Sequence, residues 1–469
     1  MRPRVRFLAS LAAGASSCLL VAVLFIYTET SYSDTSAHVS ASIRTLEGGD
    51  PAEPPVAESS PTKATAQPES LASLLWPEGT QVLRFEVLEG AILLRATLTP
   101  RSGRDTSGVF VLDTGAGFLA LDLDLARLLG IADGAAGSAA VDVAARPLAR
   151  LQLGGLQIDQ VSPVLTIDAG VIRRVTGRPV LGLLGQVLFR GRVVVLDYRE
   201  GALVILPPET DPVLPSPVAG LALSATAVAV PFRLAGDGKV LVSAWVTGRA
   251  GRPGRRLTLV VDTGATKSVF FRAALDRHFP GWTAWPALRG LGAPTLTGDE
   301  SAELVRVAGI GFRVPGGGVA RSGVDAAVLR GDLGQVLEGD VDEPVDGLLG
   351  YSFLKHYRIA LDFPRGLLWL DPSRGDVGDR LEEYCHPGLQ LESVGGAVRV
   401  LAVAEGSPAA RAGIRAGDEL VEIDGESVSG LDVVMVSRRL EGAPGTALLL
   451  HLRRGSGEWT CRLIRRRLL

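Results

Sequence analysis

VFVLDTGAGFLALD, residues 109–122, places one carboxylate, that of Asp113, between two apolar runs. These runs predict a buried strand on each side of a tight Asp-Thr-Gly-Ala loop. A carboxylate in such a loop serves either a structural turn or acid–base catalysis. The catalytic interpretation requires a second carboxylate, supplied by another part of the chain.

An internal repeat supplies this second carboxylate. Asp262 lies in LTLVVDTGATKSVFF, residues 257–271, and follows Asp113 by 149 residues. Each copy is preceded by an alternating strand pair and followed by Gly-Leu-Leu-Gly and then by an apolar strand with Leu-Asp. The matched segments are 82–98 with 228–246, 109–122 with 257–271, 182–189 with 347–354, and 194–206 with 359–370. The sequence therefore predicts two copies of one unit, over residues 81–212 and 222–372.

A duplicated unit with pseudo-twofold symmetry would bring Asp113 and Asp262 together at the symmetry axis. Two carboxylates about 3 Å apart cannot both ionise, so they share a proton. One carboxyl then activates a water molecule while the other polarises a peptide carbonyl. The glycines of the two loops allow close backbone approach, and the threonines can hydrogen-bond across the axis. These supporting residues are Thr114, Gly115, Thr263 and Gly264.

The motifs VLDTGAGFLAL with VLGLLG, and VVDTGATKSVF with VDGLLG, resemble those of the pepsin/retropepsin aspartic protease family. The resemblance covers about residues 81–372. It implies a mainly β, bilobal fold of two aspartic-protease β-barrels, a flap over the cleft between them, and cleavage of extended polypeptides. It implies Asp113 and Asp262 as the catalytic pair. Gly185 and Gly350 would end the Gly-Leu-Leu-Gly elements that support the catalytic loops, and no cofactor or metal is expected.

Two departures from the family pattern affect the expected activity. Ala116 and Ala265 stand where many pepsin-like enzymes carry Ser or Thr, whose hydroxyl would favour the charged carboxylate. We therefore expect a dyad that works at mildly acidic to near-neutral pH. No tyrosine occurs between residues 131 and 165, so the flap tyrosine of pepsin has no counterpart. We expect the flap of the first lobe to be a hairpin around Val141–Arg150, and that of the second to lie within residues 288–307.

Residues 385–469 differ in character from the two repeats. EGSPAARAGIRAGDELVEIDGESV, residues 405–428, combines a short helix of small residues, a glycine, and an Asp-Gly turn after a strand. The pattern resembles the bacterial type of PDZ domain. The resemblance implies that the loop PGLQL holds a peptide C-terminus through backbone N–H groups, beside a helix around Leu431–Leu440. The implied peptide-binding residues are Gly388, Leu389, Gln390 and Leu391, with Gln390 in place of the usual glycine.

The cysteines, histidines and lysines carry little functional signal. Cys385 and Cys461 bracket the C-terminal domain, and the sequence is equally compatible with a disulfide and with two free thiols. The five histidines lack metal-ligand spacing, so we expect all of them, at 38, 278, 356, 386 and 451, to be structural or at the surface. Lysine occurs only at 63, 239, 267 and 355, which we interpret as codon bias. The net charge of −3 gives no indication of a nucleic-acid partner.

The N-terminus predicts a membrane segment. Three arginines among the first six residues precede 21 uncharged residues, 7–27, enough for one bilayer-spanning helix. We interpret residues 1–30 as an uncleaved signal-anchor, with a cleaved signal peptide as the alternative. The positive-inside rule then places the bulk of the chain in the periplasm or outside the cell. Residues 31–80, rich in Ser, Thr, Pro, Ala and Glu, predict a disordered linker.

The leading functional hypothesis is a membrane-anchored aspartic endopeptidase whose PDZ domain recruits or positions substrate C-termini. A free C-terminus held near the cleft would raise the effective substrate concentration there. The alternative is a non-catalytic bilobal protein that binds peptides or serves as a scaffold. A third possibility is that the PDZ domain occludes the cleft until it binds a ligand. The expected partners are polypeptide substrates, a C-terminal peptide ligand and the membrane.

Overall fold

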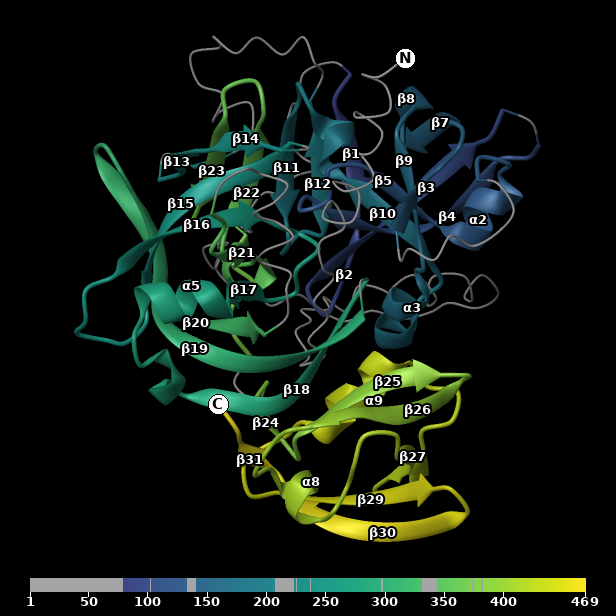
Figure 1. The fold of residues 1–469 in the computed structure, drawn as a ribbon, viewed down its shortest axis with the longest axis vertical. Helices are drawn as coiled ribbons and strands as arrows, with labels where there is room; N and C mark the ends of the chain where they lie inside the picture. Colours follow the sequence, from purple (N-terminus) through teal and green to yellow (C-terminus); the bar gives the residue numbers. More distant parts are fainter. Residues whose placement is uncertain are drawn as a thin grey trace, which may run out of the picture.

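The computed structural model describes residues 79–132 except 102, residues 141–206, residues 223–330 except 225, 237 and 297, and residues 344–469 except 373, 374, 381 and 382. The predicted membrane segment and the predicted linker as far as residue 78 lie outside the described residues. No helix within the described ranges is long and apolar enough to cross a membrane. The described chain is mainly β, as the sequence predicts, and forms two lobes and a C-terminal domain (Figure 1).

Lobe 1 is built on a nine-stranded sheet. Its strands are β2 (Glu86–Leu88), β3 (Ala91–Thr99), β4 (Thr106–Asp113), β5 (Leu119–Asp122), β6 (Val141–Val143), β7 (Leu148–Leu153), β8 (Leu156–Val161), β9 (Val164–Ile167) and β10 (Val180–Gly185). Its helices are α2 (Leu123–Leu128), α3 (Gly170–Thr176) and the 3-10 helix η2 (Gln186–Phe189). Asp122 links α2 to α3, because its carboxylate caps α2 by accepting from Asp124 N at 3.2 Å and also accepts from Arg173 Nη2 of α3 at 3.0 Å.

Lobe 2 is built on an eight-stranded sheet. Its strands are β14 (Arg233–Ala235), β15 (Lys239–Thr247), β16 (Arg255–Val261), β17 (Ser268–Phe271), β18 (Ala287–Thr295), β19 (Gly298–Val314), β20 (Gly317–Leu329) and β21 (Gly347–Leu349). Its helices are α5 (Arg272–His278), the 3-10 helix η3 (Trp282–Ala284) and α7 (Tyr351–Leu354). β18 and β19 pair antiparallel up to Thr295 and Gly298, and we refer to these two strands as the lobe-2 hairpin.

The two lobes repeat the same strand pairings around Asp-Thr-Gly-Ala. β4 pairs antiparallel with β3 and parallel with β10, and β16 likewise pairs antiparallel with β15 and parallel with β21. The strand after each loop is also equivalent, because β5 runs parallel to β9 and β17 runs parallel to β20. The repeat seen in the sequence is thus also a repeat in strand pairing.

A six-stranded sheet joins the two halves of the chain. In spatial order its strands are β1 (Gln81–Arg84), β12 (Ala202–Ile205), β11 (Val193–Asp197), β22 (Arg358–Asp362), β23 (Leu367–Asp371) and β13 (Val228–Pro231). The central pair, β11 and β22, is antiparallel and comes from different halves. Arg358 Nε lies 2.6 Å from Asp197 Oδ2 across this pair, and both side chains are buried. The sheet and this ion pair fix the relative position of the lobes.

The C-terminal domain is a small β-sandwich with two helices. Its elements are β24 (Cys385–His386), β25 (Leu389–Val394), β26 (Ala397–Val403), α8 (Pro408–Arg411), β27 (Glu419–Ile423), β28 (Glu426–Ser427), α9 (Val433–Leu440), β29 (Ala447–Arg454), β30 (Gly457–Ile464) and β31 (Arg466–Arg467). Ser407 caps α8, with Pro408 at its first position, and Asp432 caps α9. β25 is the edge strand of the larger sheet, and α9 packs against it.

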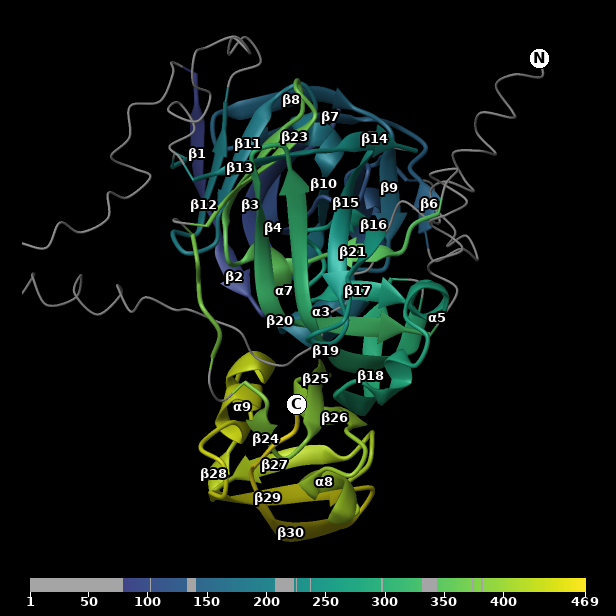
Figure 2. The same cartoon turned by 90° about the vertical axis from the view of Figure 1, so that its left-hand side faces the viewer.

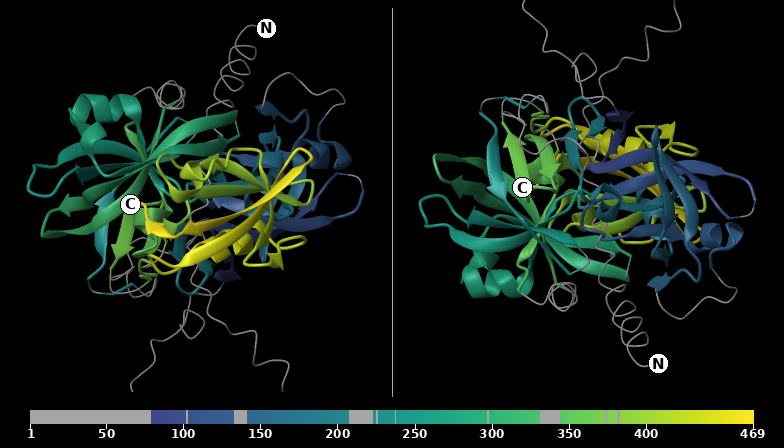
Figure 3. Two further views of the ribbon diagram at one scale, coloured as in Figure 1. Left: turned by 90° about the horizontal axis from the view of Figure 1, so that it is seen from below. Right: turned by 90° about the horizontal axis from the view of Figure 1, so that it is seen from above.

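The C-terminal domain packs against both lobes. Figures 1 and 2 show it next to α3 and β18, at the opposite end of the molecule from the six-stranded sheet. Seen from below, it lies in front of the junction of the lobes (Figure 3). β25 contacts α3 of lobe 1, and β26 contacts β18 of lobe 2. Apolar residues of lobe 1, the tip of the lobe-2 hairpin and the C-terminal domain form one buried cluster, so this arrangement excludes water.

Candidate active site

The two aspartates of the repeated motif stand at equivalent positions. Asp113 is the last residue of β4, and Asp262 directly follows β16. In the parallel pairings, Asp113 lies opposite Gly185 of β10, and Val261 lies opposite Leu349 of β21. Both aspartates have an exposed fraction of 0%. The structure therefore places both carboxylates at the ends of buried central strands.

The Gly-Leu-Leu-Gly segments require glycine for steric reasons. A Cβ at Gly182 would lie 2.1 Å from a carbonyl oxygen of β5, and one at Gly347 would lie 2.0 Å from a carbonyl oxygen of β17. At the other end of each segment, a Cβ at Gly185 or Gly350 would lie 2.1 or 2.3 Å from a carbonyl oxygen just beyond the catalytic loop. These strands thus pass the loops so closely that any side chain would displace them.

The two threonines hold the loops to each other. Thr114 Oγ1 donates to Val261 O at 2.9 Å and accepts from Thr263 N at 3.0 Å. Thr263 Oγ1 donates to Leu112 O at 2.9 Å and accepts from Thr114 N at 3.1 Å. Each hydroxyl therefore bridges to the backbone of the other lobe, as the sequence predicts, and the four bonds are buried.

Each carboxylate is oriented by backbone donors on one of its oxygens. Ala116 N donates to Asp113 Oδ1 at 2.9 Å, and Gly264 N and Ala265 N donate to Asp262 Oδ1 at 2.8 and 3.1 Å. Within the described part of the chain, neither Oδ2 atom receives a hydrogen bond from another group, and both are buried. Two ionised carboxylates cannot donate to each other, whereas one proton between them satisfies both.

The two carboxyl groups face each other across the loop glycines. A Cβ at Gly115 would lie 2.6 Å from Asp262 Cγ, and a Cβ at Gly264 would lie 2.6 Å from Asp113 Cγ. Each loop can thus approach the other only because it carries no side chain at that point. The structure thus brings the carboxyl groups of Asp113 and Asp262 together, with the loop glycines against them and the loop threonines bonded across the two lobes.

Burial dominates the electrostatics of the pair. It raises the pKa of Asp113 to about 6, although hydrogen bonds with Asp262 and the backbone, and the charge of Lys239, act in the opposite direction. Burial also raises the pKa of Asp262 well above its usual range, and the charge of Asp113 raises it further. Raised pKa values in both carboxyls favour the retention of a proton within the pair.

The predicted flap of lobe 1 is wrong, and that of lobe 2 corresponds to the lobe-2 hairpin. β6 (Val141–Val143) pairs with β9, and β7 (Leu148–Leu153) pairs with β3 and β8, so the two strands do not form a hairpin with each other. Local alternation of apolar residues identifies a strand but not its partner. In lobe 2, by contrast, β18 and the first part of β19, which pair antiparallel, cover most of residues 288–307.

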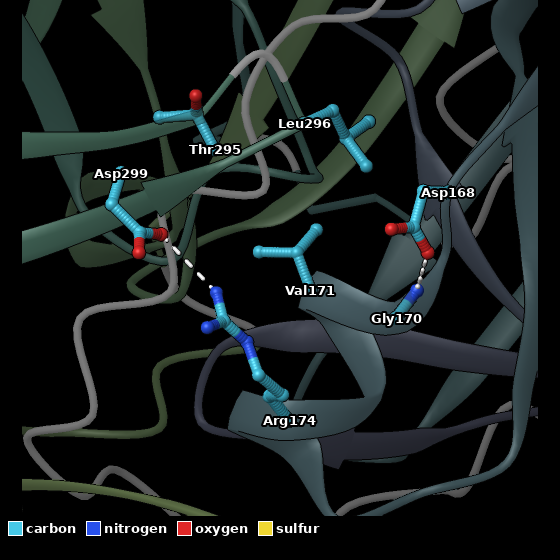
Figure 4. Close-up of a pocket in the computed structure, with 7 residues that line it drawn as sticks. All are labelled: Asp168, Gly170, Val171, Arg174, Thr295, Leu296 and Asp299. Carbon is cyan, nitrogen blue, oxygen red and sulfur yellow. Dashed lines mark hydrogen bonds and ion pairs between the residues drawn. The ribbon is translucent and has the colours of Figure 1, made fainter. Parts of the chain in front are cut away.

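A cavity of about 450 Å³ lies between α3 of lobe 1 and the tip of the lobe-2 hairpin (Figure 4). It is lined by Asp168, Gly170, Val171, Arg174, Thr295, Leu296 and Asp299. Arg174 Nη2 lies 3.2 Å from Asp299 Oδ1 across the two lobes. Asp113 and Asp262 do not line this cavity, whose walls come from α3 and the residues before it in lobe 1 and from the tip of the lobe-2 hairpin.

The predicted peptide-binding loop of the C-terminal domain is covered. Gly388 has a φ of 94°, and a Cβ there would lie 2.3 Å from Ser407 Cβ. Leu389 and Leu391 are buried in the cluster shared with lobe 1. The Gln390 side chain bonds to the lobe-2 hairpin, since its Oε1 accepts from Gly292 N at 2.8 Å and its Nε2 donates to Gly292 O at 3.1 Å. The residue that departs from the usual glycine thus makes an internal contact.

The cysteines and histidines have structural surroundings. Cys385 and Cys461 are not bonded to each other: Cys461 lies opposite Leu450, whereas Cys385 lies opposite Arg467. His386 Nδ1 accepts from Gly388 N at 2.9 Å, and burial lowers its pKa to about 3. The other described histidines lie beside carboxylates: His278 with Asp346, His356 with Asp376 and Asp379, and His451 with Glu422 and Glu458. No group of three potential metal ligands occurs in the residues that the structure describes.

The sequence interpretation missed the lysines. Lys239, Lys267 and Lys355, the three in the described ranges, are exposed by no more than 2%. Lys239 lowers the pKa of Asp113, and Lys267, five residues after Asp262, lies 2.6 Å from Glu383 in the segment that leads to the C-terminal domain. A buried lysine is rare unless it is paired, so the scarcity of lysine in an Arg-rich sequence could have directed attention to these positions.

Comparison with known proteins finds matches to both parts of the chain. The carboxyl-terminal-processing peptidase 3 of Arabidopsis thaliana is 43% identical over 61 residues, which are 13% of this chain and 12% of that protein. The carboxy-terminal processing protease CtpA of Bacillus subtilis is 34% identical over 67 residues, 14% of each chain. This chain therefore spans about an eighth of the length of these curated relatives. The aspartic proteinase from Irpex lacteus matches 64% of this chain and 99% of its own at 12% identity, with a TM-score of 0.38.

The family model for the PDZ domain matches residues 399–454. These residues run from β26 through β29 and include the helix and the Gly-Asp segment that the sequence singles out. They include most of β26, all of β27, β28 and β29, and helix α9. The edge strand β25, which precedes them, packs against β26 and α9. Residues 399–454 of this chain belong to the PDZ domain family.

Proposed function

We propose that the protein is an aspartic endopeptidase that hydrolyses polypeptides with the Asp113–Asp262 dyad. The observation that carries the proposal is the geometry of the pair: two buried carboxyls, each lying against the loop glycine of the other lobe, with both Oδ2 atoms left to a shared proton. The crossed threonine bonds add rigidity, because they tie the loops together from both sides. A merely structural turn has no need of two such groups at one point.

The chemistry follows from the charge state of the pair. The ionised carboxyl takes a proton from a water molecule, which attacks the carbonyl carbon of the peptide bond. The protonated carboxyl donates its proton to the carbonyl oxygen, so that no full charge builds up in the buried site. Collapse of the tetrahedral intermediate breaks the C–N bond: the proton gained by the base passes to the leaving nitrogen, and a hydroxyl of the intermediate returns a proton to the other carboxyl, which releases a carboxylic acid and an amine.

The PDZ domain would supply a second site for polypeptide. Its edge strand β25 and helix α9 form the usual surroundings for a peptide that adds as a strand, with its C-terminal carboxylate at the loop before β25. We propose a peptide C-terminus as the ligand, held by the backbone of residues 388–391. This arrangement would let the domain recruit or position a substrate, or respond to a separate peptide.

We also propose that residues 7–27 anchor the protein in a membrane, with the catalytic lobes on the periplasmic or extracellular side. The support is the length of the uncharged stretch and the arginines that precede it. Fractionation of cells that produce the full chain, followed by protease treatment of intact spheroplasts, tests both parts. Recovery in the soluble fraction, or protection of the lobes in intact spheroplasts, contradicts the proposal.

Digestion of a mixed peptide library by residues 79–469, at pH values from 3 to 8, tests the catalytic proposal. We expect cleavage that is lost in Asp113→Asn and, separately, in Asp262→Asn, because either change removes the acid–base pair. Asp142→Asn is a matched control, since Asp142 is exposed on β6 of the same lobe. Absence of cleavage in every folded version would instead favour a bilobal peptide-binding protein.

A further inference from the structure

The groove of the PDZ domain is already occupied by another part of this chain. β25 is an edge strand, and α9 packs beside it, so the space between them is where an added peptide strand would lie. Helix α3 of lobe 1 contacts both β25 and α9. Figures 1 and 2 show α3 directly next to these elements in both views. We call the space between β25 and α9 the PDZ groove.

The contact between α3 and the PDZ groove is apolar at its centre. Ile172 and Val175 of α3 have an exposed fraction of 0% and belong to one buried cluster with Leu391 and Val433. At the end of α3, a Cβ on Gly177 would lie 3.5 Å from Val433 Cγ1, within van der Waals contact. An internal segment therefore covers the apolar surface that a bound peptide would cover.

Ion pairs surround this apolar centre. Arg174 Nη1 lies 3.4 Å from Glu392 Oε2 of β25, and Arg178 Nη1 lies 2.7 Å from Asp432 Oδ2, the capping residue of α9. Arg174 also reaches the lobe-2 hairpin, where its Nη2 lies 3.2 Å from Asp299 Oδ1. Arg174 thus connects lobe 1, the PDZ groove and the lobe-2 hairpin at one point.

The PDZ domain also holds the lobe-2 hairpin directly. Gln390, inside the loop that would receive a peptide carboxylate, bonds to both the N–H and the carbonyl of Gly292. Glu405 N donates to Arg289 O at 2.8 Å, and Arg289 lies three residues before Gly292 on β18. The segment that enters the domain is held as well, since Lys267 and Glu383 form a buried ion pair at 2.6 Å. Two of these contacts hold β18 of the lobe-2 hairpin, and the third ties the segment before the PDZ domain to Lys267, five residues after Asp262.

We propose that α3 is an internal ligand of the PDZ groove, and that a peptide with a free C-terminal carboxylate displaces it and releases the lobe-2 hairpin. The two ligands exclude each other because both need the apolar surface of β25 and α9, while the loop that would take the peptide carboxylate is engaged by the lobe-2 hairpin through Gln390. The closed arrangement is then the resting state, and the displacing peptide is the activator. This regulation rests on the proposed peptidase function, and it assigns the PDZ domain to control of the dyad.

Charge reversal at Arg174 tests the closed arrangement. In residues 79–469, Arg174→Glu would repel both Glu392 and Asp299, so we expect library cleavage to rise about tenfold. The exchanged pair, Arg174→Glu with Glu392→Arg, restores attraction and should bring the rate back towards the original value. Arg127→Glu is the matched control, because Arg127 lies on α2, away from the PDZ domain. Within the described part of the chain its ion pair is with the exposed Asp124. Equal rates in all four proteins would overturn the proposal.

A binding measurement makes the inference independent of catalysis. Random decapeptides with a fluorescent label and a free C-terminus, and the same pool with an amidated C-terminus, are titrated into Asp113→Asn and Asp113→Asn with Arg174→Glu. We expect the free-carboxylate pool to bind about tenfold more tightly to the Arg174→Glu protein, and the amidated pool to bind both proteins equally. Equal affinity of the free-carboxylate pool for both proteins would show an open groove and overturn the inference. If no version cleaves peptides but this difference is found, the peptidase proposal fails and the internal ligand stands.

Discussion

At the scale of single residues, the geometry of the site depends on side chains that buried hydrogen bonds hold in place. Thr263 makes two of the four bonds that cross between the catalytic loops, with its hydroxyl as donor to Leu112 O and acceptor from Thr114 N. The hydroxyl is buried, so no water molecule replaces it when it is removed. A valine has nearly the same shape but offers neither bond.

Thr263→Val should therefore lower the free energy of unfolding by about 1–3 kcal/mol, the cost of leaving buried polar groups without partners. Thr263→Ser keeps the hydroxyl and should lose less. Urea denaturation followed by tryptophan fluorescence measures the difference for residues 79–469. Equal stability of the Val and Ser variants would show that the loops are held by packing and not by these bonds.

The pH dependence of cleavage also belongs to single residues. In the proposed mechanism, Asp113, whose pKa is raised by burial to about 6, must be ionised to act as base, and Asp262, whose pKa is raised well above its usual range by burial and by the charge of Asp113, must keep its proton. Activity should therefore be low below pH 6, rise as the pH passes through about 6, and fall again only when the pair loses its remaining proton. This agrees with the near-neutral optimum expected from Ala116 and Ala265.

Lys239→Met should move the rise in kcat/KM to higher pH, because the lysine charge lowers the pKa of Asp113. The matched control is Lys355→Met, which removes another buried lysine, one paired with Asp379 at 3.1 Å. A pH profile of kcat/KM, with circular dichroism to check folding, separates the two. A profile that shifts equally in both variants, or in neither, contradicts the role of Lys239.

At the scale of elements, the lobe-2 hairpin and α3 both depend on contacts with the PDZ domain. In the proposed regulation these are therefore the elements that move when the contacts break. The bonds between Gln390 and Gly292 form a two-point contact that resembles strand pairing but uses a side chain. Two side-chain bonds to one residue give less protection than a continuous ladder. Loss of these two bonds should therefore speed amide hydrogen exchange in the lobe-2 hairpin and leave the rest of the protein unchanged.

Gln390→Ala should speed hydrogen exchange at the Gly292 amide about five- to tenfold, the factor expected for one net hydrogen bond. Gln152→Ala is a fair comparison, since the Gln152 amide bonds only within lobe 1, to Gly154 O at 2.9 Å. Hydrogen exchange with mass spectrometry on the folded variants provides the measurement. Unchanged exchange at residues 287–295 in Gln390→Ala would mean that packing of β26 alone holds the hairpin.

At the scale of the whole molecule, the six-stranded sheet keeps the lobes in register for the dyad. Its central strands carry a buried ion pair, Arg358 with Asp197, in which Asp197 is exposed by 0% and also accepts from Glu200 N at 3.0 Å. A buried pair contributes little net stability, but breaking it leaves one charge without compensation. The two lobes would then separate more easily, which would also move the Asp-Thr-Gly-Ala loops apart.

Arg358→Leu should therefore cost about 3–5 kcal/mol of unfolding free energy. Arg150→Leu, which removes a guanidinium paired with Asp159 at the surface, should cost no more than about 1 kcal/mol. Thermal or urea unfolding of both variants tests the contrast. A similar small loss in both would show that the sheet tolerates an uncompensated Asp197.

The sequence by itself determined the mainly β class of the fold and the proximity of Asp113 to Asp262. Asp113 and Asp262 could be paired in advance, because a duplicated unit brings equivalent residues to its axis and because the neighbouring threonines and glycines are the types that a shared loop contact needs. The mainly β character follows from short apolar runs separated by glycines. These features are local or symmetric, so they can be recognised without knowing how distant segments meet.

Only the tertiary structure decided how the parts dock. Nothing in GVIRRVT, residues 170–176, marks this helix as the occupant of a groove more than 200 residues later in the chain. The same holds for Gln390, for the buried Lys267–Glu383 pair and for the partners of β6 and β7. The physical reason is that charges and apolar faces on separate elements can be satisfied in many ways, and the choice depends on shape complementarity across the whole molecule.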